Sequence, residues 1–206
     1  MAERVLAAVL AAGRARRFGG GKLDALCAGN RLGTWALRAV EQVGLDRTII
    51  VVPPQAPLFA RESGWPLVTN PAAELGLGTS LARAAHTAIA DGATQLLIVL
   101  ADMPLVDSAL LRELLASPAP AAMAHTPNRP GVPALLPASS LASLTKFAGD
   151  HGAASMLRMM PDISLISAPP TALLDVDDPA GLRQAAMLLQ KRRETQAAWS
   201  PRGNPV

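Results

Sequence analysis

The sequence contains little cysteine and few aromatic residues. Among its 206 residues there is one Cys and no Tyr, and aromatic residues make up 3% of the chain. The single cysteine, Cys27, cannot form an internal disulfide, and no group of Cys and His has the spacing of a zinc site, so we expect a reducing cytoplasm. The shortage of aromatic side chains argues against proteins that bind nucleic acid by stacking bases on aromatic rings.

Long apolar runs and a large excess of charge are also missing. No apolar run reaches the length of a membrane span. The run VLAAVLAA at residues 5–12 has its cations after it rather than before it, which is the reverse of a secretion signal. The net charge of +3 is modest, and a basic chain of this kind suits anionic small molecules as well as nucleic acid. Because aromatic side chains and a membrane span are both missing, the expected partner is a small anion, with neither nucleic acid nor membrane.

Half of the residues are hydrophobic, and the apolar segments alternate with helical patterns. Strands are expected at residues 4–11, 47–52, 66–69, 95–101, 121–125, 132–136 and 163–167. Helices are expected at residues 30–43, 79–90, 107–116 and 178–189. Continuously apolar strands separated by helices predict a mostly parallel, Rossmann-like sheet in a three-layer α/β/α fold. We expect one domain over residues 1–190 and a basic, flexible tail over residues 191–206.

The segment LAAGRARRFGGGK, residues 10–22, follows the first expected strand. Its small residues Ala11, Ala12 and Gly13 let a ligand approach the backbone closely. Three further glycines allow a turn rich in N–H groups, and Lys22 adds positive charge beside them. The spacing is neither that of a Walker motif nor GxGxxG. We interpret the segment as a loop that binds a triphosphate; the alternative is a basic surface loop.

Aspartates stand at two further places where strands are expected to end. Asp102 follows the most hydrophobic strand directly, where a carboxylate can bind a hard cation such as Mg²⁺. In the segment DVDDP, alternation puts Asp175 and Asp177 on one side of the chain, and Asp178 is placed to cap the last helix. Asp177 beside Asp102 would complete a site of two carboxylates, although either Asp175 or Asp177 can be the second ligand. The alternative is that all of them are turn and cap residues.

These motifs occur together, and in the same order, in one known family. The opening segment resembles the signature LAAG-x-x-x-R-M-G-x-x-K of the MobA-like nucleotidyltransferases. The resemblance continues through ELGLGTSL, ADMP, GVPALL, GDHGA and DVDDP, over about residues 5–189. Within the family the chain is most similar to the molybdopterin cytidylyltransferase (MocA-like) branch, because the guanylyltransferase branch usually reads LAGG where this chain has Leu10-Ala11-Ala12-Gly13.

The resemblance implies a fold, an activity and a set of site residues. The fold would be that of the nucleotide-diphospho-sugar transferases (GT-A-like). The activity would be Mg²⁺-dependent transfer of CMP from CTP to a phosphate-bearing acceptor such as molybdopterin, with release of pyrophosphate. A molybdenum hydroxylase or its chaperone would be the protein partner. The residues that would bind the nucleotide are Leu10, Ala11, Ala12, Gly13, Lys22, Asn70, Ser80 and Asp102. Lys22, Arg17 and Asp102 would be catalytic, Asp102 and Asp177 would hold the metal, and Gly131, Pro133, Asp150 and His151 would face the acceptor.

The departures from the family pattern lie mostly in the acceptor motifs. Val132 stands where a His or Asn is common before Pro133, and His151 stands where Lys is frequent. The acceptor is therefore left open, as is the role of His125 at the end of a strand. Other readings are a relative that uses another nucleotide such as GTP, an oxidoreductase-like relative, and a non-catalytic cofactor-delivery chaperone for a molybdenum enzyme.

Overall fold

The computed structural model describes residues 4–13, 18–149, 156–160 and 162–198. A seven-stranded sheet lies at its centre, in the order β5-β4-β1-β6-β8-β7-β9. The strands are β1 (Val5–Leu10), β4 (Thr48–Val52), β5 (Leu67–Thr69), β6 (Gln95–Leu100), β7 (Ala121–Thr126), β8 (Arg129–Pro137) and β9 (Ser164–Ser167). Strand β8 runs antiparallel to both of its neighbours, whereas every other pair in this sheet is parallel.

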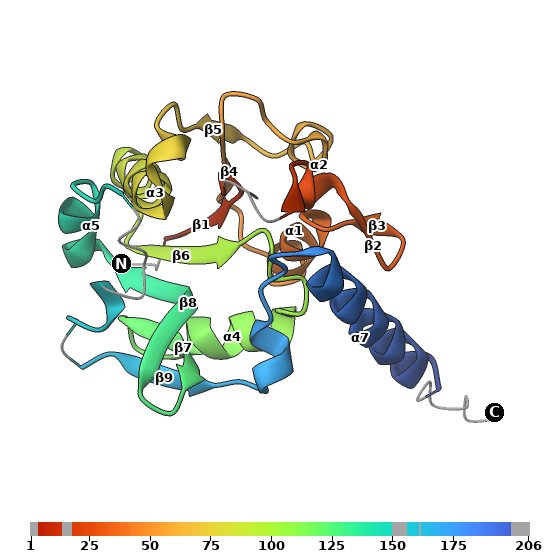
Figure 1. The fold of residues 1–206 in the computed structure, drawn as a ribbon. Coiled ribbons are helices and arrows are strands. Elements are labelled where there is room, and N and C mark those ends of the chain that lie inside the picture. Colours follow the sequence, from red (N-terminus) through yellow and green to blue (C-terminus); the bar gives the residue numbers. More distant parts are fainter. Residues whose placement is uncertain (1–3, 14–17, 150–155, 161, 199–206) are drawn as a thin grey trace, which may run out of the picture.

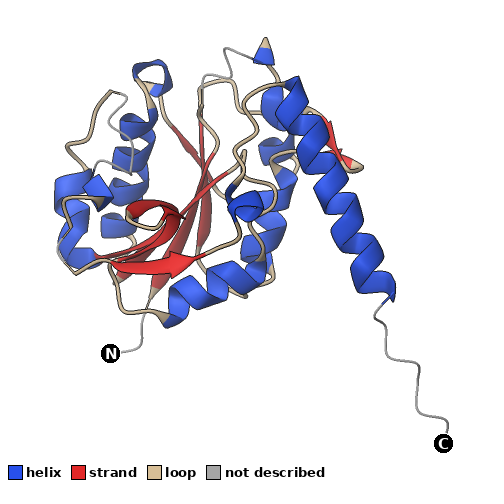
Figure 2. Ribbon diagram, turned by 60° about the horizontal axis from the view of Figure 1, so that its bottom comes forward, coloured by secondary structure: helices blue, strands red, loops and turns tan. Residues whose placement is uncertain are grey.

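Helices cover both faces of the sheet, as Figures 1 and 2 show. The α-helices are α1 (Thr34–Glu41), α2 (Leu58–Arg61), α3 (Leu77–Ala90), α4 (Ser108–Ala116), α5 (Ala138–Leu144) and α7 (Pro179–Ala198). Helices α3 and α5 pack together on one face, and α1 and α4 pack together on the other. The predicted three-layer arrangement with a mostly parallel sheet is confirmed.

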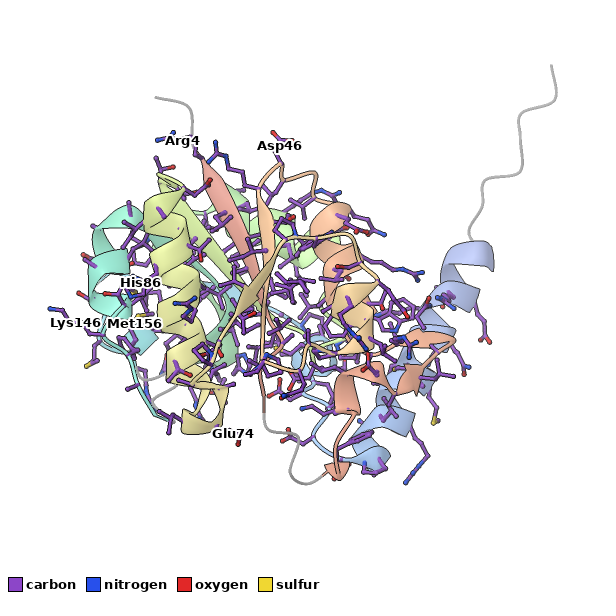
Figure 3. All side chains as sticks on the ribbon, turned by 90° about the horizontal axis from the view of Figure 1, so that it is seen from above. Arg4, Asp46, Glu74, His86, Lys146 and Met156 are labelled. Carbon is purple, nitrogen blue, oxygen red and sulfur yellow. The ribbon has the colours of Figure 1, made fainter. Side chains whose placement is uncertain are left out.

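The buried residues of the central strands are small or branched, and they form one continuous core. Ala7, Ala8 and Val9 in β1 and the run Leu96–Val99 in β6 are fully buried, as expected for strands covered by helices on both faces. Because strands β1, β4, β5, β6 and β7 run in the same direction, their carboxyl ends meet at one edge. Figure 3 shows Arg4 and Asp46, which precede β1 and β4, at one end of the molecule, and Glu74, which follows β5, at the other.

Two helix starts follow the predicted cap chemistry. The Asp107 carboxylate accepts a hydrogen bond from the Leu110 N–H at 3.0 Å at the start of α4. The Asp178 carboxylate accepts one from the Gly181 N–H at 2.8 Å at the start of α7. Both are N-cap contacts to the third residue of the helix.

The two largest differences from the predicted boundaries are at the first helix and at the C-terminal tail. The helix expected at residues 30–43 is preceded by a small hairpin of β2 (Leu26–Cys27) and β3 (Asn30–Arg31), and α1 begins only at Thr34. Ala28 and Gly29 make the turn with φ of 49° and 84°. The tail expected from residue 191 is helical as far as Ala198, because Arg192 and Arg193 of α7 donate hydrogen bonds to the carbonyls of Leu105 and Ala28. None of the helices in the described ranges is long and apolar enough to cross a bilayer.

Candidate functional site

Lys22 and Asp102 form an ion pair at the edge where β1 and β6 end. Lys22 begins the short 3₁₀ helix η2 (Lys22–Asp24), and its Nζ lies 2.7 Å from Oδ2 of Asp102. The Lys22 side chain is 7% exposed and that of Asp102 is 23% exposed. A lysine so deeply buried requires a partner for its charge, and Asp102 is that partner.

The backbone conformation of three glycines before Lys22 allows its side chain to reach Asp102. Gly19, Gly20 and Gly21 have φ of 79°, 99° and 62°, a region that residues with a side chain rarely adopt. No atom outside the adjoining residues lies within 4 Å of the place where a Cβ would stand on any of them. Glycine is therefore needed here for the backbone path rather than for lack of room.

A second acidic segment is attached to the Asp102 turn. The N–H of Val176 donates a hydrogen bond to the carbonyl oxygen of Asp102 at 3.0 Å. This contact places Oδ1 of Asp177 3.8 Å from Lys22 Nζ, with the Asp177 side chain 58% exposed. The structure therefore brings the carboxylates of Asp102 and Asp177 to the same ammonium group.

The carboxyl group of Asp175 lies in the electrostatic field of the same two carboxylates, Asp102 and Asp177. The pKa of its carboxyl group is raised to about 6, first by partial removal from water and then by the negative charges of Asp102 and Asp177. His125 and Lys22 lower the pKa, and the residue keeps an exposed surface. Three carboxyl groups from two distant segments therefore act on one another at this edge.

The donor set of this site fits a hard divalent cation. Two carboxylates already converge on one positive charge, the Lys22 ammonium, and Mg²⁺ is commonly bound by one or two carboxylates together with water and substrate phosphates. The described residues contain no group of three His, Cys, Asp or Glu side chains arranged to hold a metal without such help. A cation at Asp102 and Asp177 would thus take the rest of its coordination from water and substrate phosphates.

A cavity of about 300 Å³ lies beside the ion pair. Its walls include Ala11, Gly13, Gly20, Gly21 and Lys22 from the predicted loop. Leu10 and Ala12 are buried next to it in the chain. The cavity also has Gln55 and Arg61 in its wall, which sequence reasoning missed. Gln55 follows the carboxyl end of β4, and that position was the available signal.

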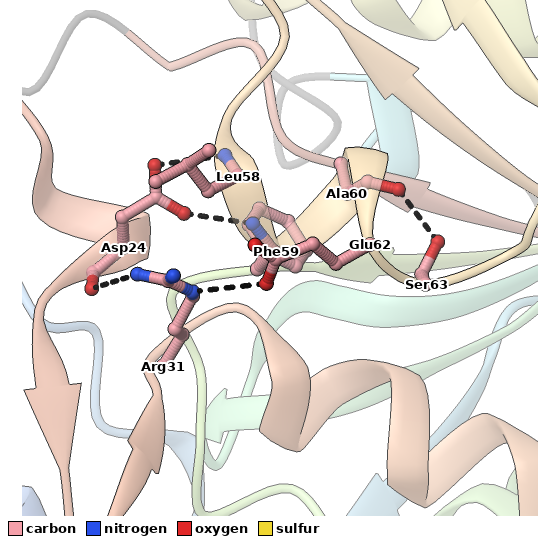
Figure 4. A network of polar contacts seen from close by, with 7 residues as sticks. All are labelled: Asp24, Arg31, Leu58, Phe59, Ala60, Glu62 and Ser63. Carbon is pink, nitrogen blue, oxygen red and sulfur yellow. Dashed lines mark hydrogen bonds and ion pairs between the residues drawn. The ribbon is translucent and has the colours of Figure 1, made fainter.

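Asp24 joins this loop to the segment that forms the far wall of the cavity. Its carboxylate accepts hydrogen bonds from the N–H groups of Leu58 and Phe59 at 2.9 and 2.8 Å, as Figure 4 shows. Its carbonyl oxygen lies 3.5 Å from Nη1 of Arg31, which also contacts Glu62. One side chain thus fixes the loop of Lys22 against α2.

Asn70 and Ser80 lie together, but both are buried and their side chains are hydrogen-bonded to each other. The Asn70 amide donates to the hydroxyls of Thr79 and Ser80 at 2.9 and 3.0 Å, and its carbonyl accepts from the Ala72 N–H. Both residues are 1% exposed. Their polar groups therefore hold the start of α3 against the end of β5.

The predicted acceptor residues are described only in part. Gly131 and Pro133 lie in β8, buried and close to the same edge of the sheet. Asp150, His151 and the predicted catalytic Arg17 lie outside the described residues.

The family model for the MobA-like NTP transferase domain matches residues 7–164 of the chain. No curated protein matches the sequence at a significant level. Among solved structures, Rv0371c from Mycobacterium tuberculosis H37Rv has a TM-score of 0.76 at 24% identity, covering 91% of this chain and 99% of that one. Rv0371c has also been solved in complex with manganese.

Two further solved structures share the fold at lower identity. The CMP:2-keto-3-deoxy-manno-octonic acid synthetase, solved in complex with CTP, has a TM-score of 0.68 at 13% identity over 92% of this chain and 100% of its own. The molybdopterin-guanine dinucleotide biosynthesis protein A from Archaeoglobus fulgidus has a TM-score of 0.63 at 18% identity over 90% and 98%. The nucleotide-diphospho-sugar transferase fold expected from the sequence is confirmed by these likenesses.

Proposed function

Because this chain belongs to the MobA-like NTP transferase domain family, we propose that it transfers CMP from CTP to the terminal phosphate of a molybdopterin-type acceptor. Its general activity is that of a nucleotidyltransferase, which moves a nucleoside monophosphate from an NTP. The observation that carries the proposal is the pair of carboxylates, Asp102 and Asp177, around Lys22, beside a cavity of about 300 Å³ whose wall includes Lys22 and two glycines of its loop.

The choice of CTP is supported by the end of β1. Leu10-Ala11-Ala12-Gly13 resembles the cytidine-using relatives, in which a residue slightly larger than glycine meets the smaller pyrimidine base. The structurally similar octonic acid synthetase was solved with CTP bound. Asn70 and Ser80 are kept in the proposed nucleotide site on the family resemblance, and the hydrogen bonds of Asn70 to Thr79 and Ser80 tie the end of β5 to the start of α3.

The reaction consists of one displacement at phosphorus. An oxygen of the acceptor phosphate forms a bond to the α-phosphorus of CTP, and the bond from that phosphorus to the bridging oxygen of the β-phosphate breaks. The departing electron pair remains on pyrophosphate. The attacking phosphate is already an anion, so no general base is needed, and catalysis rests on positioning and on neutralising charge.

The residues have separate tasks in this scheme. Asp102 and Asp177 would hold Mg²⁺, which supplies positive charge against the phosphate oxygens when it is bound. The Lys22 ammonium binds the phosphates that leave, because it lies in the wall of the cavity beside both carboxylates. Gly20 and Gly21 present a backbone that phosphates can approach closely. Arg17 is proposed as a second cation for the triphosphate.

The acceptor is proposed from the family resemblance and from the likeness to a molybdopterin-guanine dinucleotide biosynthesis protein. Gly131 and Pro133, with Asp150 and His151, would form its side of the site. A molybdenum hydroxylase or its chaperone is the proposed recipient of the product.

Two measurements test this function. Thermal shift with CTP, GTP, ATP and UTP, each with Mg²⁺, should show the largest stabilisation for CTP, since a ligand that binds only the folded state stabilises it by mass action. Pyrophosphate release should then require CTP, molybdopterin and a divalent cation together. A larger shift with GTP, or release with GTP alone, would assign the guanylyl reaction instead. Nucleotide binding without any pyrophosphate release would favour a delivery chaperone.

A further inference from the structure

Strand β7 ends in a β-bulge at His125. Ala124 pairs with Pro130 of β8 and Thr126 pairs with Arg129, so two steps along β7 match one step along β8. His125 is the residue left without a partner. Bulges of this kind redirect a side chain and occur often beside active sites, so the bulge gives His125 a direction that a regular strand would not.

The imidazole ring is held in one orientation. Nε2 lies 2.8 Å from the carbonyl oxygen of Val132, and because a carbonyl only accepts, Nε2 donates in this bond. A Cβ on residue 131 would stand 2.4 Å from Cδ2 of His125, so Gly131 leaves the space that the ring occupies. Nδ1 therefore remains the ring nitrogen that a ligand can use.

The sheet topology places this ring at the edge that carries the proposed metal and phosphate groups. β7 runs parallel to β6, with only β8 between them, so the ends of the two strands lie about 10 Å apart. His125 follows the fourth residue of β7, and Asp102 follows the end of β6. His125 also acts electrostatically on Asp175, which in turn interacts with Asp102 and Asp177.

We propose that His125 binds the attacking phosphate of the acceptor through Nδ1 and so positions it for transfer. This inference rests on the proposed function. It names the side chain that binds the attacking phosphate group of the acceptor. Val132, the residue before Pro133, is apolar and buried, so it brings no polar side chain to this edge, and His125 from the neighbouring strand supplies one.

The chemistry of the edge explains why such a group is needed. An acceptor phosphate must approach Asp102, Asp175 and Asp177, whose negative charges repel it. The O–H of a singly protonated acceptor phosphate donates a hydrogen bond to Nδ1, its unprotonated oxygens stay free to attack, and this bond offsets part of that repulsion. Because the hydrogen bond from Nε2 to the Val132 carbonyl already fixes the ring, little side-chain conformational entropy is lost when the acceptor binds.

The kinetic test uses three variants in the full chain. His125→Ala should raise the KM for molybdopterin roughly tenfold or more, as expected for the loss of one hydrogen bond to a charged group. The KM for CTP and the thermal shift with CTP and Mg²⁺ should not change. His125→Asn, whose amide can reach the position of Nδ1, should recover part of the loss. Thr126→Ala, on the same hairpin and exposed, is the matched control and should behave as the unmodified protein.

A binding test separates this inference from the choice of molybdopterin. The protein is loaded with Mg²⁺ and α,β-methylene CTP, which cannot be cleaved, and inorganic phosphate is added while the imidazole ¹⁵N resonances are recorded. Phosphate should move one histidine signal, the signal that His125→Ala removes. If that signal moves but molybdopterin releases no pyrophosphate, the proposed acceptor is wrong and the inference stands. If phosphate leaves it unmoved, or if His125→Ala changes the KM values for CTP and acceptor equally, the inference is overturned.

Discussion

The N–H of Val176 donates a hydrogen bond to the carbonyl oxygen of Asp102. This single backbone contact joins the turn after β6 to the segment before α7, two parts of the chain far apart in sequence. Each part contributes one carboxylate to the surroundings of Lys22, so the contact fixes the separation of Asp102 and Asp177 without using either side chain. Variants of the carboxylates can therefore be made without breaking the bond that aligns them.

Asp102→Asn should lower kcat/KM for pyrophosphate release by about a hundredfold or more, because a neutral amide cannot hold the cation at the transferred phosphate. Steady-state assays with CTP and molybdopterin over a range of Mg²⁺ and Mn²⁺ concentrations measure the effect. Asp107→Asn is the control, since Asn also caps helices well. Full activity of Asp102→Asn at ordinary metal concentrations would contradict the role of Asp102.

Lys22→Met should weaken CTP binding about tenfold or more while leaving a folded protein. The variant cannot form the charge-assisted hydrogen bonds that the Lys22 ammonium makes to phosphate. Methionine fills a similar volume without carrying a charge. The partner left behind, Asp102, is partly exposed to water, which limits the loss of stability. Calorimetric titration with CTP and Mg²⁺ gives the affinity, and an unchanged Kd would show that Lys22 has a structural role only.

Asp175 should make the folded protein less stable as the pH rises from about 4 to 6. Its carboxyl group has a pKa of about 6 in the folded chain and an ordinary value near 3.9 in the unfolded chain. Between these values the folded state binds the extra proton, so the stabilisation is present at low pH and is lost as the group ionises. Asp175→Asn should remove this slope and raise the melting temperature at pH 7.5. Because the residue is exposed, the gain is on the order of 1 kcal/mol or less.

The melting temperatures of Asp175→Asn and the unmodified protein at pH 4.5, 6 and 7.5 measure this effect. Asp162→Asn, at an exposed aspartate outside the site, is the control. A pH slope that stays the same in Asp175→Asn would assign the effect to other groups.

Asp24→Ala should raise the KM for CTP a few-fold with little change in kcat. The carboxylate caps the start of α2 through the N–H groups of Leu58 and Phe59, and loss of such a cap costs about 1 kcal/mol. The loop of Lys22 then loses its attachment to the far wall of the cavity. Asp24→Asn keeps one of the two acceptor oxygens and should give a smaller rise in the KM for CTP. Equal effects of both variants on kcat would argue against a positioning role.

Shortening the chain after residue 190 should destabilise the protein by about 1–3 kcal/mol. The change removes the Arg192 bond to Leu105, the Arg193 bond to Ala28 and the contact of Arg193 with the Trp35 ring at 4.8 Å, and a cation over an indole stabilises by about 0.5–2 kcal/mol. Urea unfolding gives the difference. Glu194→Ala, at an exposed position of the same helix, should stay within about 0.5 kcal/mol.

Local chemistry made much of this fold predictable. The apolar runs of β1, β4 and β6 and the caps Asp107 and Asp178 depend on neighbouring residues, so pattern and composition are enough to find them. The meeting of Lys22 with Asp102 also follows in outline, because both come after strands whose carboxyl ends share an edge.

The features that the sequence did not reveal depend on contacts between distant segments. Helix α7 continues beyond residue 190 because Arg192 and Arg193 find carbonyl partners on the Leu105 turn and the β2–β3 hairpin. The bulge at His125 depends on how β7 pairs with β8, and pairing register is not a property of either strand alone. The hydrogen bonds of the Asn70 amide to Thr79 and Ser80 join the end of β5 to the start of α3, and the sequence pattern gives no sign of them.

The reversed direction of β8 divides the sheet into two blocks of parallel strands. One block, β5-β4-β1-β6, carries Lys22 and Asp102, and the other, β7-β9, carries His125. Within the sheet, the described strands of the two blocks are joined by the backbone ladders that β8 makes with β6 and β7. On the proposed function, changes in β7 and its hairpin would alter which acceptor is taken while the strands of the nucleotide block stay the same, and this would give the fold a simple route to new substrates.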